Sequence, residues 1–178
     1  TGCLGHLPEQ AEPDANLPDD FPRTKKGSNV WRFEDLPIFP KTWKLSPKND
    51  KGVKKQLATI GKLLKKSSLV VHAGDLDREG QLLVDEVLEH FRYTGRVQRF
   101  WVSAQDSVSI RKGLANLQGN EKFVGMKLAA LGRSRADWLL GMNLSRAYTL
   151  AQQAQGMKEL IAVGRMQTPT LALVARRD

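Results

Sequence analysis

The spacing of hydrophobic and polar residues predicts alternating helices and strands between residues 54 and 117. In Lys54–Lys66 the leucines and the isoleucine recur at helical spacing and leave the lysines on the opposite face. Leu69–Ala73 is a short apolar run with two valines, which is typical of a buried parallel strand. The other predicted elements are a helix at Gly80–Phe91, a strand at Arg96–Val102 and a helix that Ser107 caps and that runs to Leu117. This order favours an α/β layer with a parallel sheet.

The pattern changes on both sides of this layer. Seven of the eight prolines fall between residues 8 and 51, which predicts a loop-rich stretch. Within the flanking sequence, Thr1–Leu7 is apolar enough for a short strand, and Trp31–Trp43 carries residues that can pack irregularly against a core. After Gly119 two helical patterns follow without a strand, Glu121–Leu140 and Leu144–Gln155. We therefore expect one domain at residues 1–118 and the start of a helical domain at residues 119–178.

Charge adds a candidate partner to this picture. The formal net charge is +9, and residues 111–178 hold 11 Lys and Arg against 4 Asp and Glu. Such an excess favours a polyanionic partner. Cys3 is the only cysteine, so a disulfide framework and a cysteine-based zinc site are excluded. No apolar run is long enough to cross a membrane and no signal-peptide pattern opens the chain, so we expect a cytoplasmic protein.

The strongest chemical signal is the acidic turn Gly74–Gly80, which reads G-D-L-D-R-E-G. It lies where a predicted strand ends and a helix begins, the usual ligand-binding edge of an α/β sheet. If the turn stays extended, Asp75, Asp77 and Glu79 point the same way, and a hard divalent cation would relieve their repulsion. The alternative is an acidic cap of a helix N-terminus, with Arg78 as an ion-pair partner.

At this point the sequence resembles a known family. The segment D-L-D-R-E-G-Q-L-L resembles the acidic motif of the Toprim domain, which occurs in type IA and type II topoisomerases, bacterial primases and some nucleases. Arg133–Ala147 and the later V-G-R-M-Q-T-P-T-L resemble the helical region that follows this domain in type IA topoisomerases, bacterial topoisomerase III above all. The resemblance covers essentially the whole chain. It implies a Rossmann-like, mostly parallel sheet followed by an all-helical segment.

The resemblance also implies roles for individual residues. Asp75, Asp77 and Glu79 would bind Mg²⁺ beside the scissile phosphate. Further along, Arg133 and Asp137 would position the cleaved strand, and a helix places these two residues on one face. The residues expected to contact single-stranded DNA are Arg165 and Gln167, with Arg146 and Asn143 extending the basic face. We expect Trp138 to be a core residue, and His6 and His72 to be structural.

The implied reaction is ATP-independent cleavage and rejoining of single-stranded DNA through a 5′-phosphotyrosine, which relaxes negative supercoils or decatenates DNA. Neither Tyr93 nor Tyr148 stands in the family's tyrosine motif, and we expect Tyr148 to be packed. The glutamate of the first Toprim strand is also missing. The chain also lacks a starting Met, so we expect it to be a piece of a longer enzyme and to be inactive alone. We further expect a monomer that is associated with the nucleoid. The alternatives are another Toprim enzyme, a nuclease or primase, and an inert basic DNA-binding module.

Overall fold

The computed structural model describes residues 17, 21–23, 29–43, 47 and 50–177. Its contacts divide the chain into two compact units. The first unit comprises Thr1–Gln10 and Leu45–Gly132, and the second comprises Ala11–Lys44 and Arg133–Asp178. The strand predicted at Thr1–Leu7 lies outside the described residues. Each unit is described separately below.

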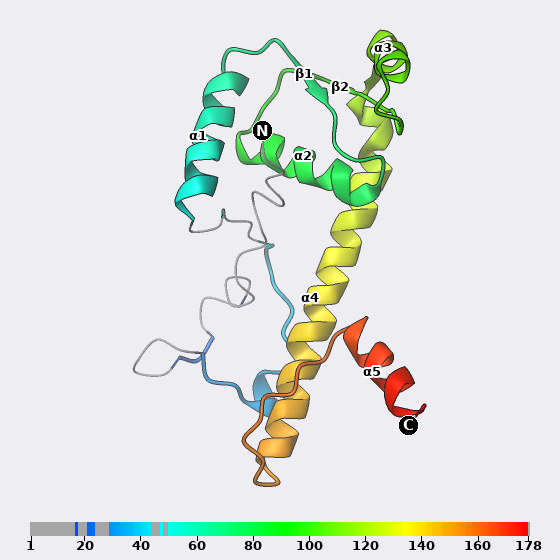
Figure 1. The fold of residues 1–178 in the computed structure, drawn as a ribbon. Helices are drawn as coiled ribbons and strands as arrows, with labels where there is room; N and C mark the ends of the chain where they lie inside the picture. Colours follow the sequence, from blue (N-terminus) through cyan, green and yellow to red (C-terminus); the bar gives the residue numbers. More distant parts are fainter. Residues whose placement is uncertain (1–16, 18–20, 24–28, 44–46, 48–49, 178) are drawn as a thin grey trace. The chain divides into compact units, whose positions relative to one another are not determined.

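The first unit is a small α/β layer (Figure 1). Its elements are α1 (Lys51–Leu64), β1 (Leu69–His72), α2 (Arg78–His90), β2 (Arg96–Arg99), α3 (Ser107–Ala115), β3 (Gln118–Gly119), the 3-10 turn η3 (Asn120–Phe123) and the start of α4 (Val124–Gln153). Strands β1 and β2 pair in parallel, with Leu69 opposite Arg96 and His72 opposite Arg99. The short β3 adds an antiparallel edge, so the sheet is mixed. The α/β fold is confirmed, while the sequence pattern did not predict β3.

Side-chain caps explain two differences from the predicted helices. One helix, α1, begins earlier than predicted, and another, α3, is capped by a different residue. The Asp50 carboxylate accepts a hydrogen bond from the backbone N–H of Val53, so α1 begins at Lys51. Asp106, and not Ser107, caps α3, because its carboxylate accepts from the N–H groups of Val108 and Ser109. In both cases an acidic side chain satisfies N–H groups that have no partner within the helix.

The interior of the first unit contains an unusual share of polar groups. Leu82 and Leu88 of α2 are buried, but so are Gln81, Asp85 and Glu86. The Gln81 amide donates to the carboxylate of Asp85 and to Asn120, whose own amide donates to Asp85. This closed network ties α2 to the segment after β3. A further correction concerns β1, where alternate side chains are about two-fifths exposed. The prediction of a strand buried on both faces is therefore wrong.

The second unit is built along the single helix α4, where the sequence predicted two helices. Gly141 and Asn143 do not interrupt it, because the buried residues Trp138, Arg146 and Thr149 recur on one face throughout. Trp138 packs with the core residues Leu17, Phe21 and Ile38. Its indole meets the ring of Trp43 edge to face at 5.3 Å. The core position of Trp138 is thus confirmed, and so is the packing of Leu36, Ile38 and Trp43, whereas Phe39, expected to pack as well, is 65% exposed.

The chain returns beside α4 in an extended segment, which a ladder of side-chain hydrogen bonds holds. Thr149 Oγ1 accepts from the N–H of Ile161, and Ser145 Oγ both accepts from the N–H of Val163 and donates to its carbonyl. Four helical residues and two extended residues each advance about 6 Å, so the two segments stay in step. The short helix α5 (Gln167–Ala175) follows, and its leucines are exposed. Among the described residues, no helix is both long and apolar enough to cross a membrane.

Candidate metal-binding turn and nucleic-acid contact

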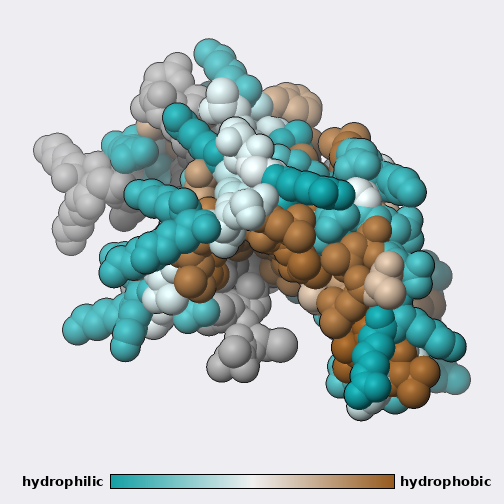
Figure 2. Space-filling view, turned by 90° about the horizontal axis from the view of Figure 1, so that it is seen from above, coloured by the Kyte–Doolittle hydropathy of each residue, from teal (hydrophilic) through white to brown (hydrophobic). Residues whose placement is uncertain are grey.

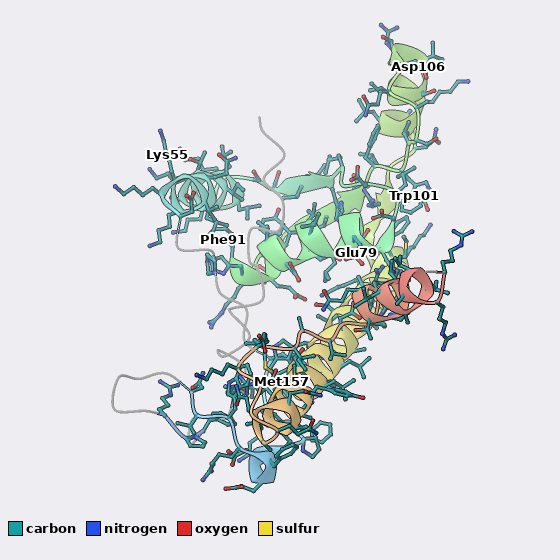
Figure 3. The ribbon with its side chains drawn as sticks, turned by 60° about the horizontal axis from the view of Figure 1, so that its bottom comes forward. Lys55, Glu79, Phe91, Trp101, Asp106 and Met157 are labelled. Atoms are coloured by element: carbon teal, nitrogen blue, oxygen red, sulfur yellow. The ribbon has the colours of Figure 1, made fainter. Side chains whose placement is uncertain are left out.

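The acidic turn connects β1 to α2 at the carboxyl end of the parallel strands. Figure 3 shows Glu79 and Phe91 at opposite ends of α2, with Trp101 at the Glu79 end. The turn is not extended as far as Glu79, because α2 begins at Arg78 and Glu79 lies in its first turn. The condition under which all three carboxylates would point the same way is therefore not met. Asp77 caps the helix, with its carboxylate accepting from the N–H of Gly80 at 2.7 Å. The capping alternative is therefore confirmed for Asp77.

Two glycines let the turn fold back against the start of α2. A Cβ on Gly74 would collide with the carbonyl of Gly80, and a Cβ on Gly80 would lie 2.5 Å from the backbone nitrogen of Asp75. Both collisions involve backbone atoms, which cannot rotate away. Glycine is thus required at both positions for the turn to approach the helix this closely.

The backbone of the turn is held from inside the unit by His72 and Arg99, both fully buried. His72 Nδ1 accepts from the N–H of Gly74, and Nε2 lies 3.2 Å from the carbonyl of Gln81. Because that carbonyl can only accept, the proton sits on Nε2, and because Nδ1 accepts a hydrogen bond, the ring is neutral. Burial, together with the Arg99 charge, lowers the pKa of His72 and favours the same state. The structural reading of His72 is consistent with these contacts.

Arg99 is a residue of this site that the sequence reasoning missed. Its guanidinium donates to the carbonyls of Gly74 and Asp75, at 2.7 and 2.5 Å, and to those of His72 and Phe100, each at 3.1 Å. The signal was present in the alternation of the strand predicted at Arg96–Val102, where Arg99 shares a face with Val97 and Trp101. An arginine on an apolar face needs buried partners, and the turn provides them.

The charges around the turn are unevenly solvated. Asp75 and Asp77 are exposed, and Arg78 lies 3.9 Å from the half-buried Glu79, as an ion pair at the surface. Deeper in α2, burial raises the pKa of Glu86 to about 7, helped by repulsion from Glu89 and Glu79. Glu89 itself pairs with Lys127.

The second unit gathers three of the predicted residues. Arg165 donates through Nε and Nη2 to both carboxylate oxygens of Asp137, at 2.5 and 3.2 Å, and Arg133 lies 3.8 Å from the same carboxylate. The hydrogen bond from Arg165, with both arginine charges, lowers the pKa of Asp137. We call these three residues the Arg-Asp cluster. The ladder along α4 brings these groups within reach, because its register places Arg165 opposite Gly141, one helical turn from Asp137, and the long arginine side chain spans that turn.

The other predicted contact residues occupy different environments. Gln167 is exposed at the first position of α5. Arg146, expected on a basic face, is only 2% exposed, and its guanidinium lies over the rings of Phe21 and Trp31. Asn143 is likewise occupied, exchanging hydrogen bonds with the backbone of Ile38. Arg146 and Asn143 face inward because the loop-rich stretch provides their aromatic and backbone partners. The spacing of residues along α4 does not predict such partners. Neither lies on a basic surface.

The two tyrosines also differ from expectation in one respect. Tyr93 donates its hydroxyl to the carbonyl of Ser67 at 3.1 Å and joins α2 to β1. Tyr148 was expected to be packed but is 54% exposed, because Arg146 and Thr149 occupy the inward face of α4 at that point.

The donor set of the turn suits a hard cation, because it consists of carboxylate oxygens. Its geometry suits such a cation only in part. Within the described residues no group of three acidic, histidine or cysteine side chains is placed to hold a metal ion together. Hard cations such as Mg²⁺ commonly use one or two carboxylates and keep several waters, and Asp75 and Asp77 are two exposed carboxylate residues of the turn.

Comparisons with known proteins agree with this arrangement. The family model for the Toprim domain matches residues 1–104, and the model described as DNA topoisomerase matches residues 121–178. DNA topoisomerase 3 of Vibrio cholerae is 47% identical over the whole chain, and that of Bacillus subtilis is 33% identical. The chain spans 27% and 23% of those two proteins. Full-length topoisomerase I from Thermotoga maritima shares the fold, with a TM-score of 0.62 at 24% identity over 99% of this chain and 26% of that one.

Residues 1–104 therefore belong to a Toprim domain, a class that in topoisomerases generally binds metal, and strands β1 and β2 of the first unit lie within it. The DNA topoisomerase segment follows it in the chain, in the order found in the relatives. The chain belongs to the type IA DNA topoisomerases and is similar in particular to the DNA topoisomerase 3 proteins. The expected resemblance is thus confirmed.

Proposed function

We propose that this chain provides the Mg²⁺-binding turn and a DNA-backbone contact of a type IA topoisomerase. The enzyme would cleave and rejoin single-stranded DNA through a tyrosine outside this chain, without ATP, to relax negative supercoils or decatenate DNA. The observation that carries the proposal is the acidic turn, whose backbone is held from within while Asp75 and Asp77 stay exposed. A bound Mg²⁺ would supply positive charge next to a phosphate. The location is proposed to be cytoplasmic, with the nucleoid.

We propose separate roles for the metal-binding and the DNA-binding residues. Asp75, Asp77 and Glu79 would hold the cation, with Asp77 keeping its hydrogen bond to the N–H of Gly80. The Arg-Asp cluster would bind the DNA backbone, because two guanidinium groups share one carboxylate and leave a net positive charge. Asp137 holds Arg165 by two hydrogen bonds and so fixes the orientation of its planar group. Gln167, exposed at the start of α5, would add an amide contact to the backbone.

Metal binding is tested on the whole chain by titrating Mn²⁺, a probe for Mg²⁺, and following water-proton relaxation. Asp75→Asn and Asp77→Asn are expected to weaken binding by about tenfold or more each, since one or two carboxylates carry the site. Glu159→Gln is the matched control, because Glu159 is an exposed carboxylate of the other unit. Unchanged Mn²⁺ affinity in both Asp variants would remove the metal site from the proposal.

DNA binding is tested by fluorescence anisotropy with a labelled oligothymidylate and with a duplex of equal length. We expect the single strand to bind more tightly, and Arg165→Met to weaken binding and reduce the salt dependence by about one counterion. Arg176→Met is the control, an exposed arginine just beyond α5. An equal effect of the two variants would show that net charge alone attracts DNA. A monomer is expected on size-exclusion chromatography.

One observation favours a second candidate, a basic DNA-binding module whose acidic turn only caps a helix. Asp77 is the cap, and the three carboxylates are not grouped among the described residues. The two candidates differ in the Mn²⁺ titration, because the binding module would not bind the ion. A nuclease or primase of the Toprim class is disfavoured by the DNA topoisomerase match at residues 121–178.

A further inference from the structure

Arg99 is the one fully buried guanidinium that contacts the acidic turn within the described residues. It lies at the end of β2, with none of its surface exposed. Burial lowers the pKa of Arg99, and the nearby carboxylates Asp85, Asp75 and Asp77 oppose this effect. Its Nε is also buried and has no hydrogen-bond partner among the described residues. A buried charge with an unpaired nitrogen is a poor way to gain stability, since an apolar side chain of similar volume often serves better.

The hydrogen bonds of Arg99 indicate what the charge does instead. Those that the structure records go to backbone carbonyls, including two successive ones in the turn, Gly74 and Asp75. The guanidinium therefore grips the main chain of the turn and leaves the Asp75 carboxylate on the exposed side. An arginine bound to the carboxylate would compete with a cation, whereas one bound to the carbonyls does not.

Neighbouring groups prevent the guanidinium from moving away. It lies 5.0 Å from the ring of Trp101 and 5.9 Å from that of Phe123, and these two rings stack on each other. In addition, His72 accepts a hydrogen bond from the N–H of Gly74, while Gly80 admits the backbone of Asp75. The turn is thus held by its carbonyls, by an amide and by close backbone packing. Two of these three restraints come from single side chains.

From these contacts we infer that Arg99 is a positioning residue, which holds the main chain of the acidic turn so that Asp75 and Asp77 are preorganised for a divalent cation. The inference rests on the proposed metal function, because it names the residue that holds the metal-binding turn in place. Holding the turn in position is a different role from acting through charge alone. A positive charge behind the carboxylates repels a cation, so its removal alone would tighten metal binding.

The charge-conserving variant Arg99→Lys separates these roles. Lysine keeps the charge but lacks the planar fork that reaches several carbonyls. We expect Arg99→Lys and Arg99→Met both to weaken Mn²⁺ binding, by about tenfold, the usual scale for outer-shell partners of a metal site. Arg96→Lys and Arg96→Met are matched controls, because Arg96 is exposed on the same strand. Both controls should bind Mn²⁺ like the wild-type chain.

Hydrogen exchange of the turn, measured without metal, is the second readout. In Arg99→Lys the amides of residues 74–77 should exchange faster, while those of α4 remain unchanged. Circular dichroism verifies the fold of each variant. If Arg99→Lys does not fold, Phe123→Leu removes one ring beside the guanidinium and replaces no residue of the turn. It should weaken Mn²⁺ binding less, but in the same direction.

The outcomes separate the inference from the function on which it rests. Wild-type affinity in Arg99→Lys, or tighter binding in Arg99→Met, would overturn the positioning role in favour of simple charge. Unchanged exchange in the turn would overturn it as well. A wild-type chain that does not bind Mn²⁺ overturns the metal function, and the exchange measurement then still decides whether Arg99 holds the turn.

Discussion

Replacing Gly80 by alanine should destabilise the first unit, although alanine is the better helix former. Gly80 lies in the first turn of α2 and is buried. A Cβ at this position would meet the N, O and Cα atoms of Asp75 at 2.5, 2.6 and 2.8 Å. Real Cβ contacts do not come closer than about 3.0 Å, so either the turn or the start of the helix must shift.

The magnitude follows from two opposing effects. Overpacking of this kind costs about 1–3 kcal/mol, and here no flexible side chain can yield. The exchange of glycine for alanine within a helix returns about 0.5–1 kcal/mol. We expect a net loss of about 1–2 kcal/mol. The shift would also disturb Asp75, so Mn²⁺ affinity should fall with stability.

Gly132→Ala is the matched control, because it makes the same change in another helix of the same unit. Nothing lies within 4 Å of a Cβ at Gly132. This variant should therefore be stabilised by about 0.5–1 kcal/mol. Urea unfolding followed by circular dichroism measures both variants. The steric reasoning is refuted if Gly80→Ala is as stable as the wild-type chain, or if both variants change stability in the same direction.

Three further predictions concern polar groups that are buried or half-buried. Ser145→Ala leaves the N–H of Val163 without its hydrogen-bond partner, so we expect the second unit to lose about 1–3 kcal/mol of stability and to bind oligothymidylate more weakly. Thr170→Ala, which changes an exposed residue of α5, is the control. Equal effects of the two variants would contradict the role of the hydrogen-bond ladder. The His72 ring should remain the neutral Nε2–H tautomer at pH 6.5 in a ¹⁵N NMR spectrum; since its pKa is lowered on folding, its contribution to stability is complete above pH 6.5 and is lost as the pH falls below that. Glu86 has the opposite sign, because its pKa rises from 4.5 to about 7 and the ionised form is the costly one, so Glu86→Gln should stabilise the chain at pH 8 and not at pH 4; an equal effect at both pH values would contradict this.

The exposure of apolar side chains at the surface could not be predicted from the hydrophobic pattern alone. Figure 2 shows apolar side chains reaching the surface between long hydrophilic ones. Val108 and Leu114 of α3 are more than half exposed, and Leu63 of α1 is 61% exposed although its spacing places it on the apolar face. Periodicity reports which face of a helix is apolar, but it does not report how much of that face another element covers.

Local order was largely determined by the sequence, because the signals for it lie within a few residues. The helix predicted at 54–66 lies at 51–64, the strand predicted at 69–73 lies at 69–72, and the glycine-flanked turn follows that strand. These predictions used spacing, valines and glycines that are close together in the chain. The family resemblance, carried by D-L-D-R-E-G and by Arg133–Ala147, was sufficient for a classification that the comparisons confirm. The metal and DNA roles of individual residues stay predictions.

Only the tertiary structure decided which charged groups meet. Arg165 reaches Asp137 across 28 residues because two hydroxyl groups on α4 set the position of the returning segment. Arg146 turns inward because aromatic rings of the loop-rich stretch cover it, and Arg99 is buried because the carbonyls of the turn receive its hydrogen bonds. In each case the partner is distant in sequence. For the two buried arginines, the charge is stable only where such partners gather around it. The sequence alone therefore located the acidic turn, while the fold determined what holds it.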